Sequence, residues 1–141
     1  MTPPETLDLN ALDFESSAAA GARLDLHHPT TNAPTGAWLQ LLGVDSDAYR
    51  AALRATQRAR LKQASRNKRI VLTPEELEAE ALNLLVIATT GWGGFVQGGQ
   101  PLDFSAEAAR ALYARHNWIR EQAEEFVNDR ANFLPKSATS S

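Results

Sequence analysis

Apolar residues recur at helical spacing most clearly after Thr73. The pattern widens toward its end, so it predicts a helix over 73–90 that lies in the core. Its apolar positions are Leu77, Ala81, Leu82, Leu84, Leu85, Val86, Ile87 and Ala88. Thr73 and Glu76 can form a capping box, and Pro74 at the first helical position favours the same start. Five of the eight glycines fall between residues 91 and 99, and a glycine C-cap there predicts the end of the helix.

Residues 21 to 27 alternate between apolar and polar side chains, which predicts a half-buried strand with Ala22, Leu24 and Leu26 on one face. Turn-forming proline, asparagine and glycine residues follow. A second apolar segment can then pair back, so a β-hairpin is predicted over 21–42. Because a lone hairpin is marginally stable in water, its leucine face must pack on helices.

Three further helices are predicted over 46–67, 105–114 and 117–132. Their expected N-caps are Asp45 or Ser46, Ser105 and Asn117. The first of them has only a thin apolar stripe, made of Tyr49, Ala52, Leu53, Thr56 and Leu61. The predicted fold is therefore α+β and mainly α, with an N-terminal hairpin packed on a bundle of about four helices.

The length of 141 residues suits one domain, expected over 18–134. An acidic flexible arm over 1–17 and a disordered tail over 135–141 are predicted to flank it. The absence of cysteine excludes disulfides and thiolate chemistry. The pattern shows neither a signal segment nor an apolar stretch that could cross a bilayer, so we expect a cytoplasmic protein without membrane contact.

Basic residues gather in the second predicted helix. Eight of the 14 lysines and arginines lie between Arg50 and Arg69, and Arg50, Arg54 and Arg58 share one helical face. Such a segment can bind phosphates, but it lacks interleaved aromatic residues, and the sequence pI of about 5.6 is unusual for a nucleic-acid-binding domain. A solvated face is the favoured interpretation, and a protein partner or nucleic acid stays open.

Two catalytic or ligand-binding interpretations are disfavoured. Gly93 and Gly98 have the spacing of a phosphate loop, but Gly99 and Gln100 stand where lysine and a hydroxyl residue are needed. The three histidines, His27, His28 and His116, lack convergent metal ligands in the sequence. We therefore expect no enzyme activity, no cofactor and no metal site.

The order of several segments resembles the tail assembly chaperones of long-tailed bacteriophages and prophages. The segments are GARLDLHHPTTNAPTGAWLQLLGVDSDAYR, the GW that follows an apolar helix, PLDFSAEAARALY and WIREQAEEFVNDRANFL. They span roughly residues 19–134, and the likeness lies in their order and spacing. The resemblance implies a protein of the host cytoplasm that binds the tape-measure protein, helps recruit the tail-tube protein and is absent from the finished virion. It implies no enzymatic activity and no cofactor.

A chaperone for helical clients needs exposed apolar and aromatic surface. On this hypothesis the partner-binding residues are Trp92, Phe95, Trp118, Phe126 and Phe133, with Arg50, Arg54 and Arg58 for acidic patches on the client. Core packing is the alternative role for each aromatic residue. Self-association also stays open.

Two other functions remain as alternatives. A structural head–tail or minor tail component of the virion would use the same aromatic residues permanently. A nucleic-acid-binding regulator would use the basic residues between Arg50 and Arg69.

Overall fold

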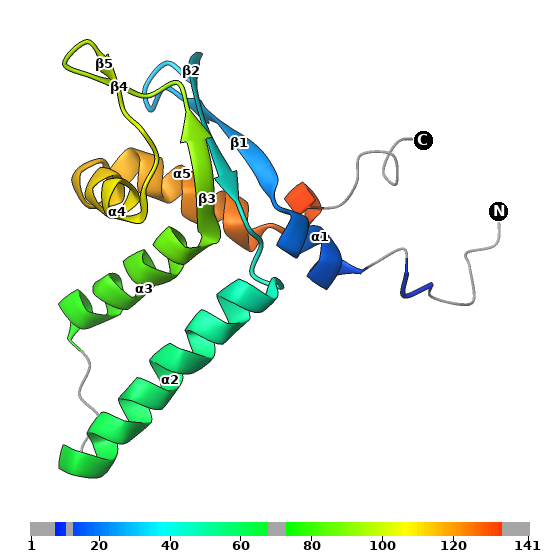
Figure 1. Cartoon of the computed structure of the whole chain (residues 1–141), viewed down its shortest axis with the longest axis vertical. Helices are drawn as coiled ribbons and strands as arrows, with labels where there is room; N and C mark the ends of the chain where they lie inside the picture. The colour runs from blue at the N-terminus through cyan, green and yellow to red at the C-terminus, as the bar shows by residue number, and fades with distance from the viewer. Residues whose placement is uncertain (1–7, 11–12, 68–72, 134–141) are drawn as a thin grey trace.

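The computed structural model describes residues 8–10, 13–67 and 73–133, and its fold is α+β and mainly α, as the sequence predicts (Figure 1). The elements follow in the order α1 (Phe14–Ala20), β1 (Ala22–His27), β2 (Pro34–Leu41), α2 (Asp47–Asn67), α3 (Pro74–Ala88), β3 (Thr89–Gly93), β4 (Val96–Gln97), β5 (Gln100–Pro101), α4 (Ala106–Arg115), α5 (Asn117–Asn128) and η1, a 3-10 helix (Arg130–Phe133). The predicted hairpin corresponds to β1 and β2. The predicted tail, 135–141, and much of the predicted arm lie outside the described residues.

The strands β1, β2 and β3 form an antiparallel sheet in that order. Leu24 pairs with Leu39, and Leu39 pairs with Trp92, so apolar side chains line up across one face of the sheet. The helices α4 and α5 lie on this side of the sheet (Figure 1). Leu39 and Leu41 have no exposed surface, which locates the core between the sheet and these helices.

The opposite face of the sheet carries a stacked tryptophan. Trp38 lies so close over Gly93 that a Cβ at this glycine would be 2.6 Å from the indole Nε1. The guanidinium of Arg23 sits 4.6 Å from the Trp38 ring, in a cation–π contact, and Arg23 also binds Asp25 at 3.0 Å. Glycine at position 93 thus lets the indole lie flat on the sheet.

The strand β3 corrects the predicted end of the preceding helix. The sequence predicts a helix through residue 90, but α3 ends at Ala88 and Thr89 already has an extended conformation. The hydroxyl of Thr89 donates to the Leu85 carbonyl at 2.8 Å, which closes the last turn. Threonine is β-branched and suits a strand, and pairing with β2 draws these residues into the sheet.

The N-terminal segment is more ordered than predicted. The sequence predicts a flexible arm over 1–17, but residues 14–17 belong to α1. Asp13 caps this helix, because its carboxylate accepts a hydrogen bond from the Ser16 backbone at 3.1 Å. Hydrogen bonds from Ser16 also lower the pKa of Asp13.

The helix α1 docks where three parts of the chain meet. The backbone N–H of Gly43 donates to the Ala18 carbonyl at 3.1 Å. A Cβ at Gly43 would lie 2.8 Å from the Ala18 Cβ and 3.2 Å from the Phe133 ring. Ala18 and Phe133 are both buried, so a residue without a side chain is needed between them.

The last helix is shorter than predicted. The sequence predicts it over 117–132, but α5 ends at Asn128 and η1 follows. The Asn132 amide donates to the Phe126 carbonyl at 3.0 Å, and the Asp129 carboxylate accepts from the Ala131 backbone at 3.1 Å. Such local side-chain hydrogen bonds compete with the helical ones and break the helix.

The predicted N-cap residues are confirmed for three helices and wrong for one. Thr73, Ser105 and Ser46 each accept a hydrogen bond from the backbone N–H three residues later, at 3.0 to 3.2 Å. The prediction for Asn117 is wrong, because His116 occupies the N-cap position and Asn117 is the first helical residue.

Candidate functional site: an exposed helical arm

The helix α2 stands apart from the core. Among its described side chains, residues 47–66, none is buried, although the helix has 21 residues. In α3 the buried side chains are those of the last turn, Leu85, Val86 and Ala88. Figure 1 shows α2 and α3 extending away from the sheet as a pair. We call α2 and α3 together the helical arm.

Polar contacts fix the base of α2. The buried Ser46 caps the helix, and Arg130 of η1 donates to both carboxylate oxygens of Asp45, at 2.6 and 3.0 Å. This bond raises the pKa of Arg130. Tyr49, in the first turn, is half-buried, and its burial, with the nearby Glu124 carboxylate, raises its pKa. The arm therefore leaves the domain from an anchored point.

Arg60 and Glu80 join the two helices farther out. The Arg60 Nε donates to the Glu80 Oε2 at 3.0 Å, and the Nη2 donates to the other carboxylate oxygen. This bidentate bond raises the pKa of Arg60 and lowers the pKa of Glu80. The two side chains keep 35% and 24% of their surface exposed, so water screens their attraction. The pair orients α2 against α3 more than it stabilises the fold.

Large apolar side chains remain exposed on the helical arm. In the described part of the chain six such side chains are exposed, and four of them belong to α2 and α3. They are Leu53, Leu61, Leu77 and Ile87, with exposed fractions of 38 to 66%. The sequence pattern predicts that they face inward, and this is wrong because the arm extends beyond the sheet. Scattered exposed leucines are ordinary, but a concentration on one pair of helices is typical of an interaction surface.

Five cations follow one row of α2. Arg50, Arg54 and Arg58 share a face as predicted, and Lys62 and Arg66 continue the same four-residue spacing. All five are exposed, and none of them forms an ion pair with another described residue. We call this row the basic ridge. The sequence prediction stopped at the third member, although the spacing of the last two is readable in the sequence.

The five aromatic residues predicted to bind a partner do not form one surface. Trp92 and Phe133 are buried, with 8% and 6% of their surface exposed. Phe95, Trp118 and Phe126 are half-buried against the core. A buried ring cannot contact a partner in this conformation, so core packing is the role that the geometry favours for Trp92 and Phe133.

The buried rings belong to two separate clusters. Trp92 packs edge-to-face with Phe95 and with Phe104, each at 5.1 Å between ring centroids, and its Nε1 donates to the Leu102 carbonyl at 2.9 Å. Phe126 and Phe133 form a second pair at 5.4 Å. Edge-to-face pairs of this kind stabilise a core.

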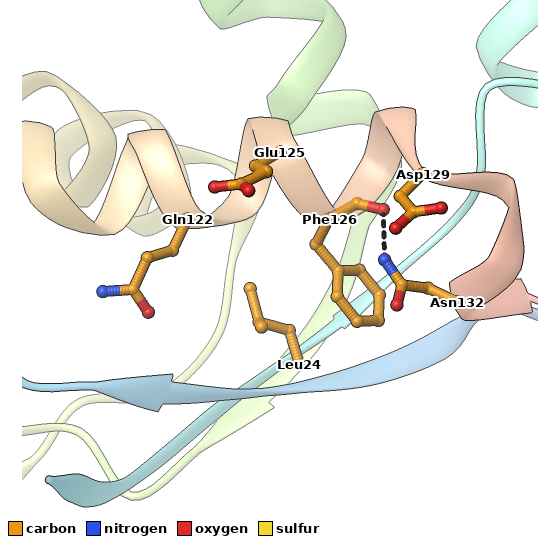
Figure 2. A pocket seen from close by; sticks show the side chains of 6 residues that line it. All are labelled: Leu24, Gln122, Glu125, Phe126, Asp129 and Asn132. Atoms are coloured by element: carbon orange, nitrogen blue, oxygen red, sulfur yellow. Dashed lines mark hydrogen bonds between the residues drawn. The ribbon is translucent and has the colours of Figure 1, made fainter. Parts of the chain in front are cut away.

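Figure 2 shows a shallow pocket between α5 and β1, with a volume of 270 Å³. The lining residues are Leu24, Gln122, Glu125, Phe126, Asp129 and Asn132. The Gln122 side chain is already engaged, because it accepts from the His27 N–H at 3.1 Å and donates to the His27 carbonyl at 2.8 Å. The described lining residues supply carboxylates and amides but no hydroxyl, thiol, amine or imidazole group.

The histidines have structural surroundings. The His28 Nδ1 accepts from the Thr30 backbone at 3.2 Å, within the turn between β1 and β2. In the described residues no group of three or more His, Cys, Asp or Glu is placed to bind a metal ion. Within the same part of the chain, no helix combines the length and the apolar character needed to cross a membrane.

Comparison of the chain with protein-family models, with curated proteins and with solved structures gave no match.

Proposed function

We propose that this chain is a tail assembly chaperone of a long-tailed bacteriophage or prophage that acts in the host cytoplasm. In this role it binds the tape-measure protein, keeps it soluble, helps recruit the tail-tube protein and is released before the virion is complete. The observation that carries the proposal is the helical arm, in which α2 has no buried side chain among residues 47–66 and leucines are exposed on both helices. The order of the sequence segments supports the same role.

The arm suits a reversible contact with another helix. A client helix can lay its apolar face against Leu61 of α2 and Leu77 of α3, which lie close in sequence to the paired Arg60 and Glu80. The base of α2 is held by Ser46 and by the bond between Asp45 and Arg130, so the arm can bind and release a client without unfolding the core. Burying a few leucines gives an affinity low enough for release.

The proposal moves the contact surface from aromatic rings to leucines. Trp92 and Phe133 are excluded because they are buried. Phe95, Trp118 and Phe126 keep part of their surface and remain secondary contacts.

The test is co-expression with the tape-measure protein of the same phage or prophage. We expect the wild-type chain to raise the soluble fraction of the tape-measure protein several-fold, and the double variant Leu61→Gln, Leu77→Gln to lose most of this effect. Val96→Gln is the matched control, because Val96 and Leu61 are both 66% exposed and Val96 lies outside the arm. Equal activity of the double variant and the control would refute the role of the arm, and an insoluble tape measure with the wild-type chain would refute the proposed function.

Mass spectrometry of purified particles separates a chaperone from a structural component. A chaperone is absent from the particles, whereas a head–tail or minor tail component is found there in a fixed ratio to the tail tube.

A further inference from the structure

The basic ridge and the exposed Leu61 share one surface of α2. Leu61 lies three residues after Arg58 and seven after Arg54, so it neighbours both cations on the helix surface. Leu53 lies seven residues before Arg60, on the side of α2 that meets α3. Leu61 is 66% exposed within this basic surface. The surface is thus amphipathic, with an apolar contact point flanked by positive charge.

The ridge has a regular length and spacing. Four residues of α-helix rise about 6 Å, so the five cations from Arg50 to Arg66 span about 24 Å. Four residues turn an α-helix by about 400°, so each cation lies about 40° farther round α2 than the one before, and a partner helix along α2 faces the middle three, Arg54, Arg58 and Lys62. Carboxylates that gather on one face of the partner helix can pair with these three cations.

We infer that the α2 surface selects an amphipathic helix with a row of Asp or Glu beside its apolar face. This inference rests on the proposed function, and it states the chemistry of the client segment. Leu61 contacts the apolar face of the client, and Arg54, Arg58 and Lys62 pair with its carboxylates. Complementary charge also raises the association rate and disfavours basic helices as clients.

Phosphates of a nucleic acid fit this surface less well. Leu61 would lie against a charged backbone and gain nothing from the contact. Among the described residues of α2 the only aromatic side chain is Tyr49, which is half-buried at the base and cannot stack on a base. The exposed leucine therefore favours a helical protein segment as the occupant.

The experiment uses two synthetic helical peptides with the same apolar face, one with a glutamate flank and one with a lysine flank. Fluorescence anisotropy measures their binding to the full chain at low and at physiological ionic strength. We expect the glutamate peptide to bind about tenfold more tightly than the lysine peptide, with a difference that shrinks as salt is added. Equal binding of the two peptides, or binding of neither, overturns the inference.

Charge reversal on α2 locates the effect. The double variant Arg54→Glu, Arg58→Glu is expected to bind the glutamate peptide about tenfold or more weakly than the wild type does, because attraction becomes repulsion at two positions. The matched control is Arg23→Glu with Arg115→Glu, two exposed positions outside the helical arm with the same change in net charge. Circular dichroism of both variants confirms that they are folded. An equal loss in both pairs overturns the inference, because it then reflects net charge alone.

A duplex DNA of mixed sequence is the competitor in the same assay. If the duplex displaces the glutamate peptide at a lower concentration than unlabelled peptide does, the ridge is a phosphate site and the inference is overturned. If the two peptides bind equally while Leu61→Gln weakens both, selection by charge fails but the capture of helices by the arm stands. The co-expression experiment then tests the proposed function independently of the peptide assay.

Discussion

Leucine has opposite surroundings in the sheet and in the helical arm. Leu39 and Leu41 have no exposed surface, whereas Leu61 on α2 leaves 66% of its surface in water. The sheet is held by apolar burial between β2, β3, α4 and α5. In the arm the last turn of α3 is buried, whereas α2 has polar contacts at Ser46, Asp45 and Glu80 and its two leucines are exposed. The fold thus depends on one set of leucines, and the other set is free for recognition.

The largest expected effect tests this contrast directly. Leu39→Ala should lower the free energy of unfolding by about 2–5 kcal/mol, because it removes buried methyl groups and leaves a cavity. Leu61→Ala should change it by less than about 0.5 kcal/mol, because the side chain is exposed and alanine favours a helix. Urea denaturation followed by circular dichroism measures both. Similar losses in the two variants would mean that the leucines of α2 are also part of the core.

A smaller effect is expected from the buried hydroxyl pair of the core. Tyr113→Phe removes the 2.7 Å hydrogen bond to the Thr89 hydroxyl, while Thr89 keeps its bond to the Leu85 carbonyl. We expect a loss of about 1 kcal/mol in the free energy of unfolding.

The pH dependence of Tyr113 sharpens this prediction. Burial raises the pKa of Tyr113 to about 12. An unfolded tyrosine ionises near pH 10, so the folded state favours the neutral phenol. The stability that comes from the neutral phenol is complete below about pH 10 and is lost as the pH rises toward 12. Between those values the wild type should therefore lose more stability than Tyr113→Phe, and equal losses would contradict the burial of this phenol.

The smallest expected effect concerns the outer part of the arm. Because Arg60 lowers the pKa of Glu80, the contact is complete above the ordinary glutamate pKa of about 4.3 and weakens as the pH falls through the lowered value. Spin labels at Gln57→Cys and Ala79→Cys report the distance between α2 and α3, since the chain has no cysteine of its own. We expect the distance to widen in acid in the wild type. In Glu80→Gln it should be wide already at neutral pH, and an unchanged distance there would show that other contacts hold the arm closed.

Local signals in the sequence predict most of the elements. Helix starts at Thr73 and Ser105 depend on residues three positions apart, and the alternation of β1 depends on neighbours, so each can be recognised in a short segment. The strand β3 cannot be recognised in this way, because Gly91 and Gly93 have no side chains that could alternate between apolar and polar. It exists because its backbone pairs with β2, about fifty residues earlier in the chain.

The candidate site was predicted only in part, for a similar reason. The spacing of Arg50, Arg54 and Arg58 identifies a shared basic face from the sequence alone. The spacing of Leu53 and Leu61 predicts an apolar stripe, but periodicity does not say whether another element covers it. For the aromatic residues the reverse holds. Tryptophan is common in interfaces, which favours exposure of Trp92, but Phe95 and Phe104 cover it in the fold.

The meeting of Ala18, Gly43 and Phe133 has a consequence for biosynthesis. Of the described elements, α1 leaves the ribosome first, and Gly43 soon offers it a backbone partner. Its apolar cover from Phe133 arrives only after every other described element has been made. Contacts between such distant residues form late, so we expect nascent chains that stop short of Phe133 to keep the N-terminal helix accessible to proteases while the sheet is already paired.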